Sequence, residues 1–170
     1  ILLKMKKLIL AITILFSTLS FAQNSLPKIN VTSVDGQTVN TSSFTNDGNP
    51  IVISFWATWC KPCMRELDAM AEVYEDWQED LGVKIIAVSI DDSRNSGKVG
   101  PLAKTKGWEY DVFIDQNQDF KRALGVNNIP HTFVLDGNGN IVWQHTGYAL
   151  GDEDELYEVL EKVAAGEAVN

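Results

Sequence analysis

The sequence predicts an α/β sandwich with a mixed central sheet. Short apolar runs typical of buried strands alternate with amphipathic segments of helical period, which is the pattern of a sheet covered by helices. Two short strand-like segments around an Asp-Gly pair near residue 35 predict a β-hairpin before the alternation begins. The 170 residues, 45% hydrophobic and 22% charged, suit one globular domain.

Charge and cysteine content exclude several classes of protein. The chain has 14 Lys and Arg against 23 Asp and Glu, a formal net charge of -9. This balance argues against a nucleic-acid partner, because such partners require a basic surface. Two cysteines are too few for a disulfide-stapled scaffold or a four-cysteine zinc site.

Residues 1–22 have the pattern of a secretory signal peptide, with Met5 as an alternative start. Three lysines precede an apolar run over 8–16, and Ser20 and Ala22 are small residues in the -3 and -1 positions of a cleavage site. The alternative is an uncleaved N-terminal anchor. Export would place the protein in the periplasm or on the extracytoplasmic face of the membrane, where disulfide chemistry is permitted.

The mature chain is expected to begin loosely over 23–28. Residues 29–34 and 37–39 then form the hairpin, with Asp-Gly in a tight primed turn. The next strand, 51–56, is apolar except for Ser54, which is typical of a strand buried on both faces.

A long helix is expected after that strand, with one apolar stripe at helical spacing. It ends at Gly82, and 83–90 form the next buried strand. The stripe consists of Cys63, Leu67, Met70, Tyr74 and Trp77.

The second half of the chain continues the alternation. Asp91 and Asp92 are interpreted as caps of a helix within 94–106 rather than as a metal site, and glycines and Pro101 weaken the first part of that helix. His145 is expected on the surface. The remaining elements are a strand over 110–114, a short helix over 119–124, strands over 132–135 and 140–146 around a turn at 136–139, and a final helix over 152–164. The domain spans 29–165, with a tail over 166–170.

The chemistry is concentrated in Trp59-Cys60-Lys61-Pro62-Cys63, at the junction of a buried strand and a helix. The first turn of a helix has unpaired N–H groups and a positive dipole end, which stabilise a thiolate at Cys60. Lys61 adds positive charge, and Pro62 suits the start of a helix. Cys63 falls one turn further, within reach of a disulfide. An exposed thiolate beside a resolving thiol is what thiol–disulfide exchange requires.

The cysteine pair has three alternative interpretations: a structural disulfide, half of a metal site, and two unrelated cysteines. The second function class is a Cu(I) carrier that uses Cys60, Cys63 and His131, since soft thiolates select this ion. A third is a thiol peroxidase, whose usual arrangement of a lone reactive cysteine is missing.

Two segments resemble a known family. Phe55-Trp56-Ala57-Thr58-Trp59-Cys60-Lys61-Pro62-Cys63 is similar to the active-site run of thioredoxin-fold proteins, and Asn128-Ile129-Pro130-His131-Thr132-Phe133 to their cis-proline segment. With the export signal and the hairpin, the chain resembles the TlpA/ResA-like extracytoplasmic thiol–disulfide oxidoreductases over residues 26–165. The resemblance implies a thioredoxin-like three-layer α/β/α sandwich with a mixed central sheet and an N-terminal β-hairpin.

The resemblance also implies roles. Cys60 would attack, Cys63 would resolve, and Pro130 would be cis beside the disulfide. The backbone of Ile129 and the apolar surface of Trp59 would receive a disulfide-containing protein substrate. Electrons would come from an upstream thiol donor. No cofactor and no metal are expected, since no dinucleotide fingerprint follows any strand, and a monomer is the default for this size.

Two departures from the family concern the proton chemistry. Thioredoxin has a buried Asp where this chain has Ser54, whereas TlpA/ResA-like proteins often place a Glu where this chain has Glu66. The helical pattern puts Glu66 at the core edge beneath Cys63, where partial burial would raise its pKa to a value useful for proton transfer. The alternative is a solvated helix carboxylate. His131 stands where Thr is more usual, and is expected near the sulfur atoms at the mouth of the site.

Overall fold

The computed structural model of the protein describes residues 25–169, and the predicted signal peptide lies outside them. None of the helices within 25–169 has the length and apolar character needed to cross a membrane. The strands are β1 Asn30–Ser33, β2 Thr38–Asn40, β3 Ile51–Trp56, β4 Lys84–Ser89, β5 Asp111–Ile114, β6 His131–Leu135 and β7 Ile141–Thr146. The helices are α2 Lys61–Leu81, α3 Val99–Lys106, α4 Asp119–Ala123 and α5 Asp152–Ala164, with 3₁₀ turns η1 Thr41–Ser43 and η2 Ser96–Lys98.

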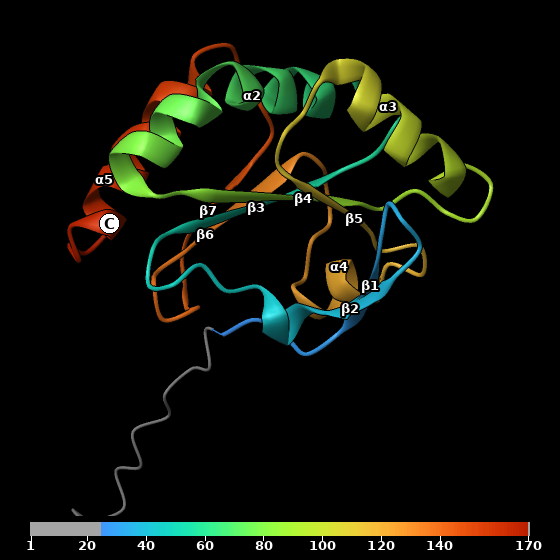
Figure 1. The fold of residues 1–170 in the computed structure, drawn as a ribbon, viewed down its shortest axis with the longest axis horizontal. Helices are drawn as coiled ribbons and strands as arrows, with labels where there is room; N and C mark the ends of the chain where they lie inside the picture. The colour runs from blue at the N-terminus through green and yellow to red at the C-terminus, as the bar shows by residue number, and fades with distance from the viewer. Residues whose placement is uncertain (1–24, 170) are drawn as a thin grey trace, which may run out of the picture.

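The strands form one mixed sheet in the order β2-β1-β5-β4-β3-β6-β7. The central strands β3, β4 and β5 are parallel, and the remaining pairings are antiparallel. Helices α2, α3 and α5 cover one face of the sheet, and α4 lies on the other (Figure 1). The predicted three-layer α/β/α sandwich with an N-terminal hairpin is therefore confirmed.

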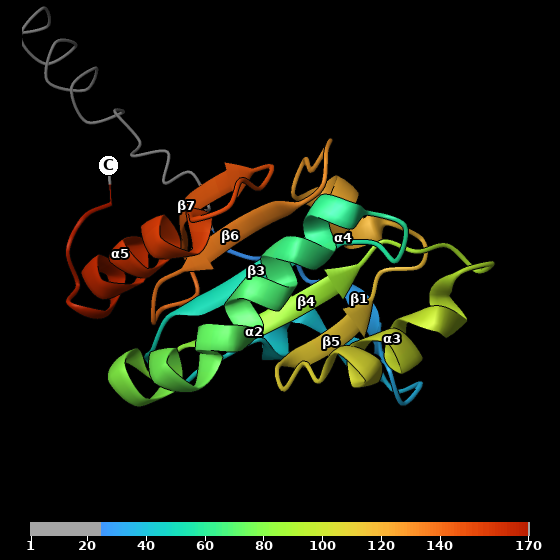
Figure 2. The same cartoon turned by 90° about the horizontal axis from the view of Figure 1, so that it is seen from above.

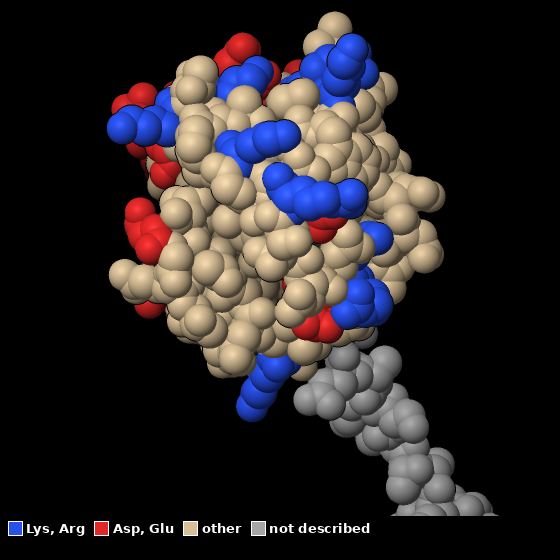
Figure 3. All heavy atoms as spheres, turned by 90° about the vertical axis from the view of Figure 1, so that its right-hand side faces the viewer, with Lys and Arg blue, Asp and Glu red and all other residues tan. Residues whose placement is uncertain are grey.

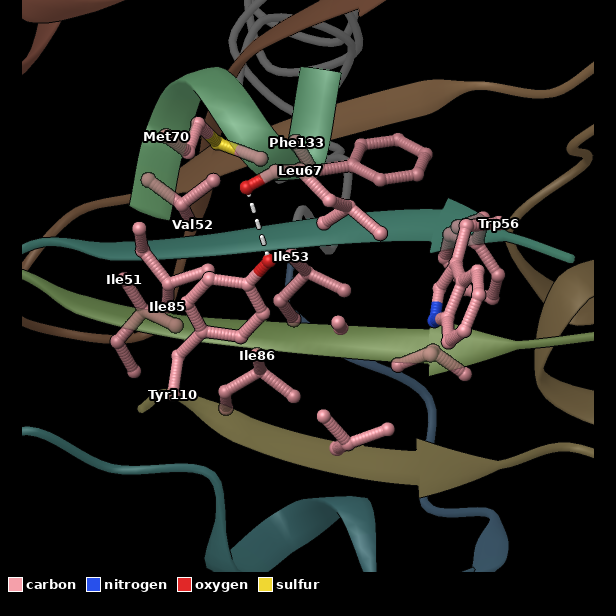
Figure 4. Packing of buried hydrophobic residues seen from close by; sticks show 14 of the residues in the cluster. Ile51, Val52, Ile53, Trp56, Leu67, Met70, Ile85, Ile86, Tyr110 and Phe133 are labelled. Carbon is pink, nitrogen blue, oxygen red and sulfur yellow. Dashed lines mark hydrogen bonds between the residues drawn. The ribbon is translucent and has the colours of Figure 1, made fainter. Parts of the chain in front are cut away.

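One part of the core lies between α2 and the sheet, and another lies on the opposite face, where Phe120 of α4 packs against Phe44 and Phe55. All six residues of β3 are buried, and so is every residue of the predicted apolar stripe of α2. Figure 4 shows side chains of α2 and of β3, β4 and β5 packed together, and the Tyr110 hydroxyl donates to the carbonyl oxygen of Leu67 at 3.0 Å. This contact ties β5 to the middle of α2. Gly82, in the left-handed conformation, ends α2 as predicted.

The parallel strands aim their carboxyl ends at one side of the molecule. Seen from above, β4 and β5 point toward the same side, and α2 begins near that end and runs back along the sheet (Figure 2). The connection from β3 to α2, which carries both cysteines, therefore lies at the carboxyl edge of the sheet, where open α/β sheets usually bind their ligands.

The structure corrects two local predictions. The hairpin has a three-residue loop over 34–36 instead of a two-residue primed turn. Ser33 N donates to the carbonyl oxygen of Gln37 at 2.8 Å, and only Gly36 has a positive φ, +83°. This is a turn followed by a left-handed residue, the second common type of hairpin connection.

The helix predicted within 94–106 begins later than expected. Residues 96–98 form η2, and α3 starts at Val99. Pro101 is tolerated because it lies in the first turn of α3, where the N–H groups have no partner within the helix. Asp91 does not cap this helix: its carboxylate binds elsewhere, as described below.

Candidate active site: a disulfide at the start of α2

Cys60 and Cys63 form a disulfide at the N-terminus of α2. Cys60 is the N-cap residue, and its Sγ accepts a hydrogen bond from the Cys63 N–H at 3.3 Å. Lys61 and Pro62 are the first two helical residues, so Pro62 removes an N–H that would have no helical partner. Because a helix N-terminus favours negative charge, this position stabilises a thiolate on Cys60 when the disulfide is reduced.

Cys60 and Cys63 are much less exposed to solvent than the side chains next to them. Cys63 is fully buried and Cys60 is 6% exposed, whereas the Trp59 side chain beside them is 63% exposed. Lys61 is also exposed. A partner therefore meets Trp59 and the edge of Cys60 first, and Cys63 lies behind.

Asp91, from the end of β4, holds the connection between β3 and α2. Its carboxylate accepts hydrogen bonds from Thr58 N at 2.8 Å, Thr58 Oγ1 at 2.7 Å and Ser89 Oγ at 2.7 Å. Asp91 is fully buried. Sequence reasoning missed this contact and interpreted Asp91 as a helix cap. No local pattern reveals it, because Asp91 and Thr58 are 33 positions apart.

The Ile129–Pro130 peptide bond is cis, as predicted. The segment leads into β6, which pairs antiparallel with β3, so that His131 lies opposite Phe55. The N–H of Gly147 donates to the carbonyl oxygen of Pro130 at 2.9 Å. The cis-proline segment is thereby held beside the end of β3, next to the cysteine connection.

Glu66 is buried beneath the disulfide, one turn after Cys63. It is 6% exposed; Ser54 Oγ donates to its Oε2 at 2.7 Å, and Thr132 Oγ1 donates to its Oε1 at 2.8 Å. Burial raises the pKa of Glu66 from 4.5 to about 7, and the two hydroxyl hydrogen bonds only partly oppose that rise. Glu66 is thus buried, which excludes the alternative of a solvated carboxylate, and its part in proton transfer stays a prediction.

Ser54 and Thr132 are functional neighbours that sequence reasoning did not assign. Ser54 stands where thioredoxin has its buried acid, and here it binds the carboxylate supplied by the helix. Thr132 follows His131 on β6 and is 2% exposed. A buried hydroxyl at this position requires a partner, which is the signal that could have pointed to Glu66.

His131 is turned toward β7. Its Nε2 lies 3.0 Å from Gln144 Oε1 and its Nδ1 lies 3.1 Å from Thr146 Oγ1, and the ring stacks on Phe133 with centroids 4.5 Å apart. Burial lowers the pKa of His131, so the ring is neutral at pH 7. Both ring nitrogens thus have partners on β7, and the placement of His131 at the mouth of the site stays a prediction. Within residues 25–169, no three His, Cys, Asp or Glu side chains are grouped to hold a metal ion.

The charged residues are unevenly distributed around this edge. Figure 3 shows the side of the molecule toward which β4 and β5 point, where Lys and Arg side chains lie mainly in the upper and right-hand parts, with a few Asp and Glu side chains among them and a broad area without charged groups at lower left. The chain as a whole has a net charge of -9. This side of the molecule therefore carries a number of Lys and Arg side chains although the chain as a whole is acidic.

The fold and the site together define a thiol–disulfide oxidoreductase of the thioredoxin class: a CxxC disulfide at the N-terminus of a helix, at the carboxyl edge of a mixed sheet, beside a cis-proline. The particular family follows from comparison with known proteins. The model of the AhpC/TSA family matches residues 22–144, and the chain belongs to this family.

Individual relatives agree with this class. The chain is 30% identical over 137 residues to the thiol–disulfide oxidoreductase ResA of Bacillus thuringiensis, which covers 81% of this chain and 75% of the relative. An uncharacterized thioredoxin-like protein from Porphyromonas gingivalis is 51% identical, with a TM-score of 0.74 over 82% of this chain and 92% of the other. A putative thiol:disulfide interchange protein DsbE from Chlorobium tepidum, 24% identical with a TM-score of 0.72 over 82% and 95%, shares the fold.

Proposed function

We propose that the protein is an exported protein-disulfide reductase. In its reduced form it gives two electrons to a disulfide of another protein, and an upstream thiol donor then reduces it again. The resemblance of residues 1–22 to a signal peptide supports a place in the periplasm or on the extracytoplasmic face of the membrane. The dithiol carries both electrons, so the cycle needs no bound cofactor and no metal.

The electrons and protons balance in two steps. The Cys60 thiolate attacks the substrate disulfide, forms a mixed disulfide and releases one substrate thiolate, which takes a proton. Cys63 then loses its proton to the ionised Glu66 carboxylate, attacks Cys60 Sγ and releases the second substrate sulfur as a thiolate, which takes a proton from solvent. The substrate disulfide is reduced, and the Cys60–Cys63 pair is oxidised.

The substrate surface is assigned to the exposed side chains and backbone beside Cys60. Trp59 is 63% exposed and offers an apolar contact to an incoming chain. The backbone of Ile129, next to the cis Pro130, offers hydrogen bonds to an extended segment. An exposed apolar side chain beside a backbone that can form hydrogen bonds fits an unfolded or flexible segment that carries a disulfide.

The observation that carries the reducing direction is the buried Glu66. A dithiol becomes a strong oxidant when its reduced thiolate form is stabilised. Here the group buried next to the resolving thiol is a carboxyl, which disfavours a second negative charge once it is ionised. Lys61 is exposed and the His131 ring is neutral, so neither supplies a buried positive charge.

The reduction potential of the Cys60–Cys63 pair tests this proposal. Trp56 and Trp59 flank the pair, so tryptophan fluorescence in defined dithiol buffers should report its redox state. We expect a potential of about -270 mV or lower, the range of thioredoxin. A potential near about -120 mV would make the protein a disulfide donor and overturn the proposed direction.

A matched pair of variants tests the part played by Glu66. Glu66→Gln removes the ionisable group and should raise the potential, because the resolving thiolate loses a negative neighbour. Glu75→Gln makes the same change on the exposed face of α2 and should leave the potential as in the unmodified protein. Equal potentials for all three proteins would remove Glu66 from the explanation.

A further inference from the structure

A small cavity adjoins Glu66 between α2, α5, β6 and β7. The space open to water is about 20 Å³, and about 10–15 Å³ is enough for one water molecule. The polar side chains that line it are Glu66, Thr132, His145, Tyr148, Asp152, Glu153 and Glu155. Met70, Trp143 and Leu156 complete the walls. The cavity is therefore large enough for one water molecule, and the few polar groups in its mainly apolar wall, the Glu66 carboxyl among them, can bind that water.

The cavity joins a sealed group to a pair in contact with solvent. Glu66 is 6% exposed, whereas the side chains of His145 and Asp152 are 38% and 30% exposed. His145 Nε2 lies 3.6 Å from Asp152 Oδ2. One end of the cavity is thus a buried acid, and the other is an acid–imidazole pair that water reaches.

Proton transfer from Cys63 creates a need for such a connection. Cys63 is fully buried, so a proton that it passes to Glu66 stays inside the protein until Glu66 releases it. Two hydroxyl groups already donate to the Glu66 carboxyl. Glu66 returns to its starting state either by giving the proton back to Cys63 at the next reduction or by releasing it to solvent, and the second way needs a polar route.

We propose that a water molecule in this cavity carries protons between Glu66 and the Asp152–His145 pair, which exchanges them with solvent. The inference rests on the role of Glu66 in the proposed function. On oxidation, Cys63 gives its proton to Glu66, Glu66 gives one to the water, and the water passes one to Asp152 or His145 and from there to solvent. On reduction by the thiol donor the same steps run in reverse.

The other ionisable groups around Glu66 keep their protons or lie further out. Burial strongly raises the pKa of Tyr110, and burial together with Glu153 raises the pKa of Tyr148 to about 12, so both phenols stay neutral at pH 7. The Tyr148 hydroxyl donates to Glu153 Oε2 at 2.8 Å. Glu155 is exposed on α5. Of the remaining groups, Glu153 accepts from Tyr148 and Gly151, and Asp152 and His145 form the pair that lines the cavity and reaches solvent.

The test uses a variant that keeps the shape of the pair. In Asp152→Asn/His145→Gln the new side chains are close in size, and the amide oxygen at 152 can still accept from Ala149 N, as Asp152 does at 2.7 Å. The control is Asp154→Asn, which removes the same charge from the same turn of α5 on an exposed residue outside the cavity.

The measurement is the rate at which the reduced protein forms its Cys60–Cys63 disulfide with glutathione disulfide, followed by tryptophan fluorescence. In weak buffer we expect the double variant to be slower by about tenfold, within the range of general acid–base effects, and imidazole should restore the rate. Asp154→Asn should match the unmodified protein. An unchanged rate in the double variant overturns the proposal. A slow rate that imidazole does not restore also overturns it, because a purely structural defect would behave in that way.

The Glu66→Gln variant in the same assay separates this inference from the proposed function. If its rate equals that of the unmodified protein, Glu66 takes no proton and the resolving step proposed above fails. If Glu66→Gln is slow while the double variant is fast, Glu66 keeps its role and only the route through the cavity fails.

Discussion

The carboxyl group of Glu66 lies inside the protein between a hydroxyl from β3 and a hydroxyl from β6. With a pKa of about 7, it is protonated in part of the molecules at neutral pH. An acid of this kind can either take or give a proton at little cost, which suits a group next to a thiol that must do the same. Burial of the ionised carboxylate lowers the stability of the folded state.

Replacing Glu66 should change how stability depends on pH. A carboxyl whose pKa is higher in the folded state than in the unfolded chain destabilises the fold as pH rises from 4.5 to about 7. The cost is absent at lower pH and complete above about 7, where it reaches about 3 kcal/mol. Glu66→Gln should remove this pH-dependent loss, as measured by urea unfolding of the oxidised protein at pH 4.5 and pH 8. The same loss in Glu66→Gln and in unmodified protein would contradict the assignment.

At the residue scale, sequence reasoning succeeded where a helix set the geometry. The three-residue spacing from Cys63 placed Glu66 under the disulfide, since residues three apart share a helix face. It failed where contacts join distant segments. Thr132 reaches Glu66 across 66 positions, and the orientation of His131 depends on Gln144 and Thr146 of the neighbouring strand.

At the scale of elements, the connection between β3 and α2 depends on β4. The Asp91 carboxylate accepts from both the backbone and the side chain of Thr58, and the Asp91 N–H donates to Ser89 Oγ at 3.1 Å. This buried carboxylate restrains the segment that presents Trp59 and Cys60. The position of the nucleophile is therefore set partly by a strand that contributes no reacting group.

Asp91→Asn should loosen this connection. The amide has one acceptor oxygen where the carboxylate has two, so a buried donor of Thr58 or Ser89 loses its partner at a cost of about 1–3 kcal/mol. We expect that loss in urea unfolding, together with slower reduction of a protein disulfide. Asp92→Asn is the control, because Asp92 pairs with Arg94 on the surface and surface pairs are worth about 0–1 kcal/mol. Equal stabilities for the two variants would show that Asp91 does not hold the connection.

Two loops at the end of the sheet away from the disulfide are in contact at a glycine: the turn between β6 and β7, and the loop before β3. A Cβ added at Gly137, in the turn between β6 and β7, would lie 1.9 Å from the carbonyl oxygen of Gly48. Gly137→Ala therefore requires a backbone shift, and we expect it to lower the free energy of unfolding by about 2–3 kcal/mol. Gly97→Ala, where a Cβ meets nothing within 4 Å, should cost less than about 1 kcal/mol. Similar unfolding midpoints for both variants would contradict the close approach.

Elements with strong periodicity were predicted closely. The strand over 51–56 and the helix over 152–164 have the predicted bounds, because each is defined by its own apolar pattern. The hairpin loop and the start of α3 were harder to predict. Both depend on the turn geometry of a few residues, which composition alone does not determine.

At the scale of the whole molecule, negative charge gathers between α2 and α5. Asp76, Glu79 and Asp80 of α2 line the same groove as Glu153, Asp154 and Glu158 of α5. The carboxylates that pair with Lys84, Arg94, Lys106 and Arg122 lie outside this groove. Repulsion across the groove therefore opposes the packing of α5 on α2.

Moderate salt should stabilise the protein. Sodium chloride at 0.5 M shortens the screening length to a few ångströms and weakens this repulsion. We expect the Tm to rise by about 2–4 °C relative to 0.02 M salt, which corresponds to about 1 kcal/mol for a chain of this size. Differential scanning calorimetry of the oxidised protein measures it. A Tm that falls with salt would mean that attractive pairs outweigh the repulsion.

The fold class was predictable because strands and helices alternate along the chain. The order of the strands in the sheet was not predictable. The hairpin strand β1 joins the sheet beside β5, with Thr32 opposite Ile114. Such a pairing between segments some 80 positions apart depends on the final packing of both. The sequence predicted the hairpin but offered no signal for its neighbour.

The disulfide joins residues only three positions apart, and this short spacing has a thermodynamic consequence. Folding and oxidation form a closed thermodynamic cycle. The free energy of unfolding therefore differs between the oxidised and the reduced protein by the same amount as the free energy of forming the disulfide differs between the folded and the unfolded chain. A loop this short restricts the unfolded chain little. The potential of the pair is therefore displaced from that of a free peptide mainly by its folded neighbours, and calorimetry of the two redox forms reads that displacement without any redox buffer.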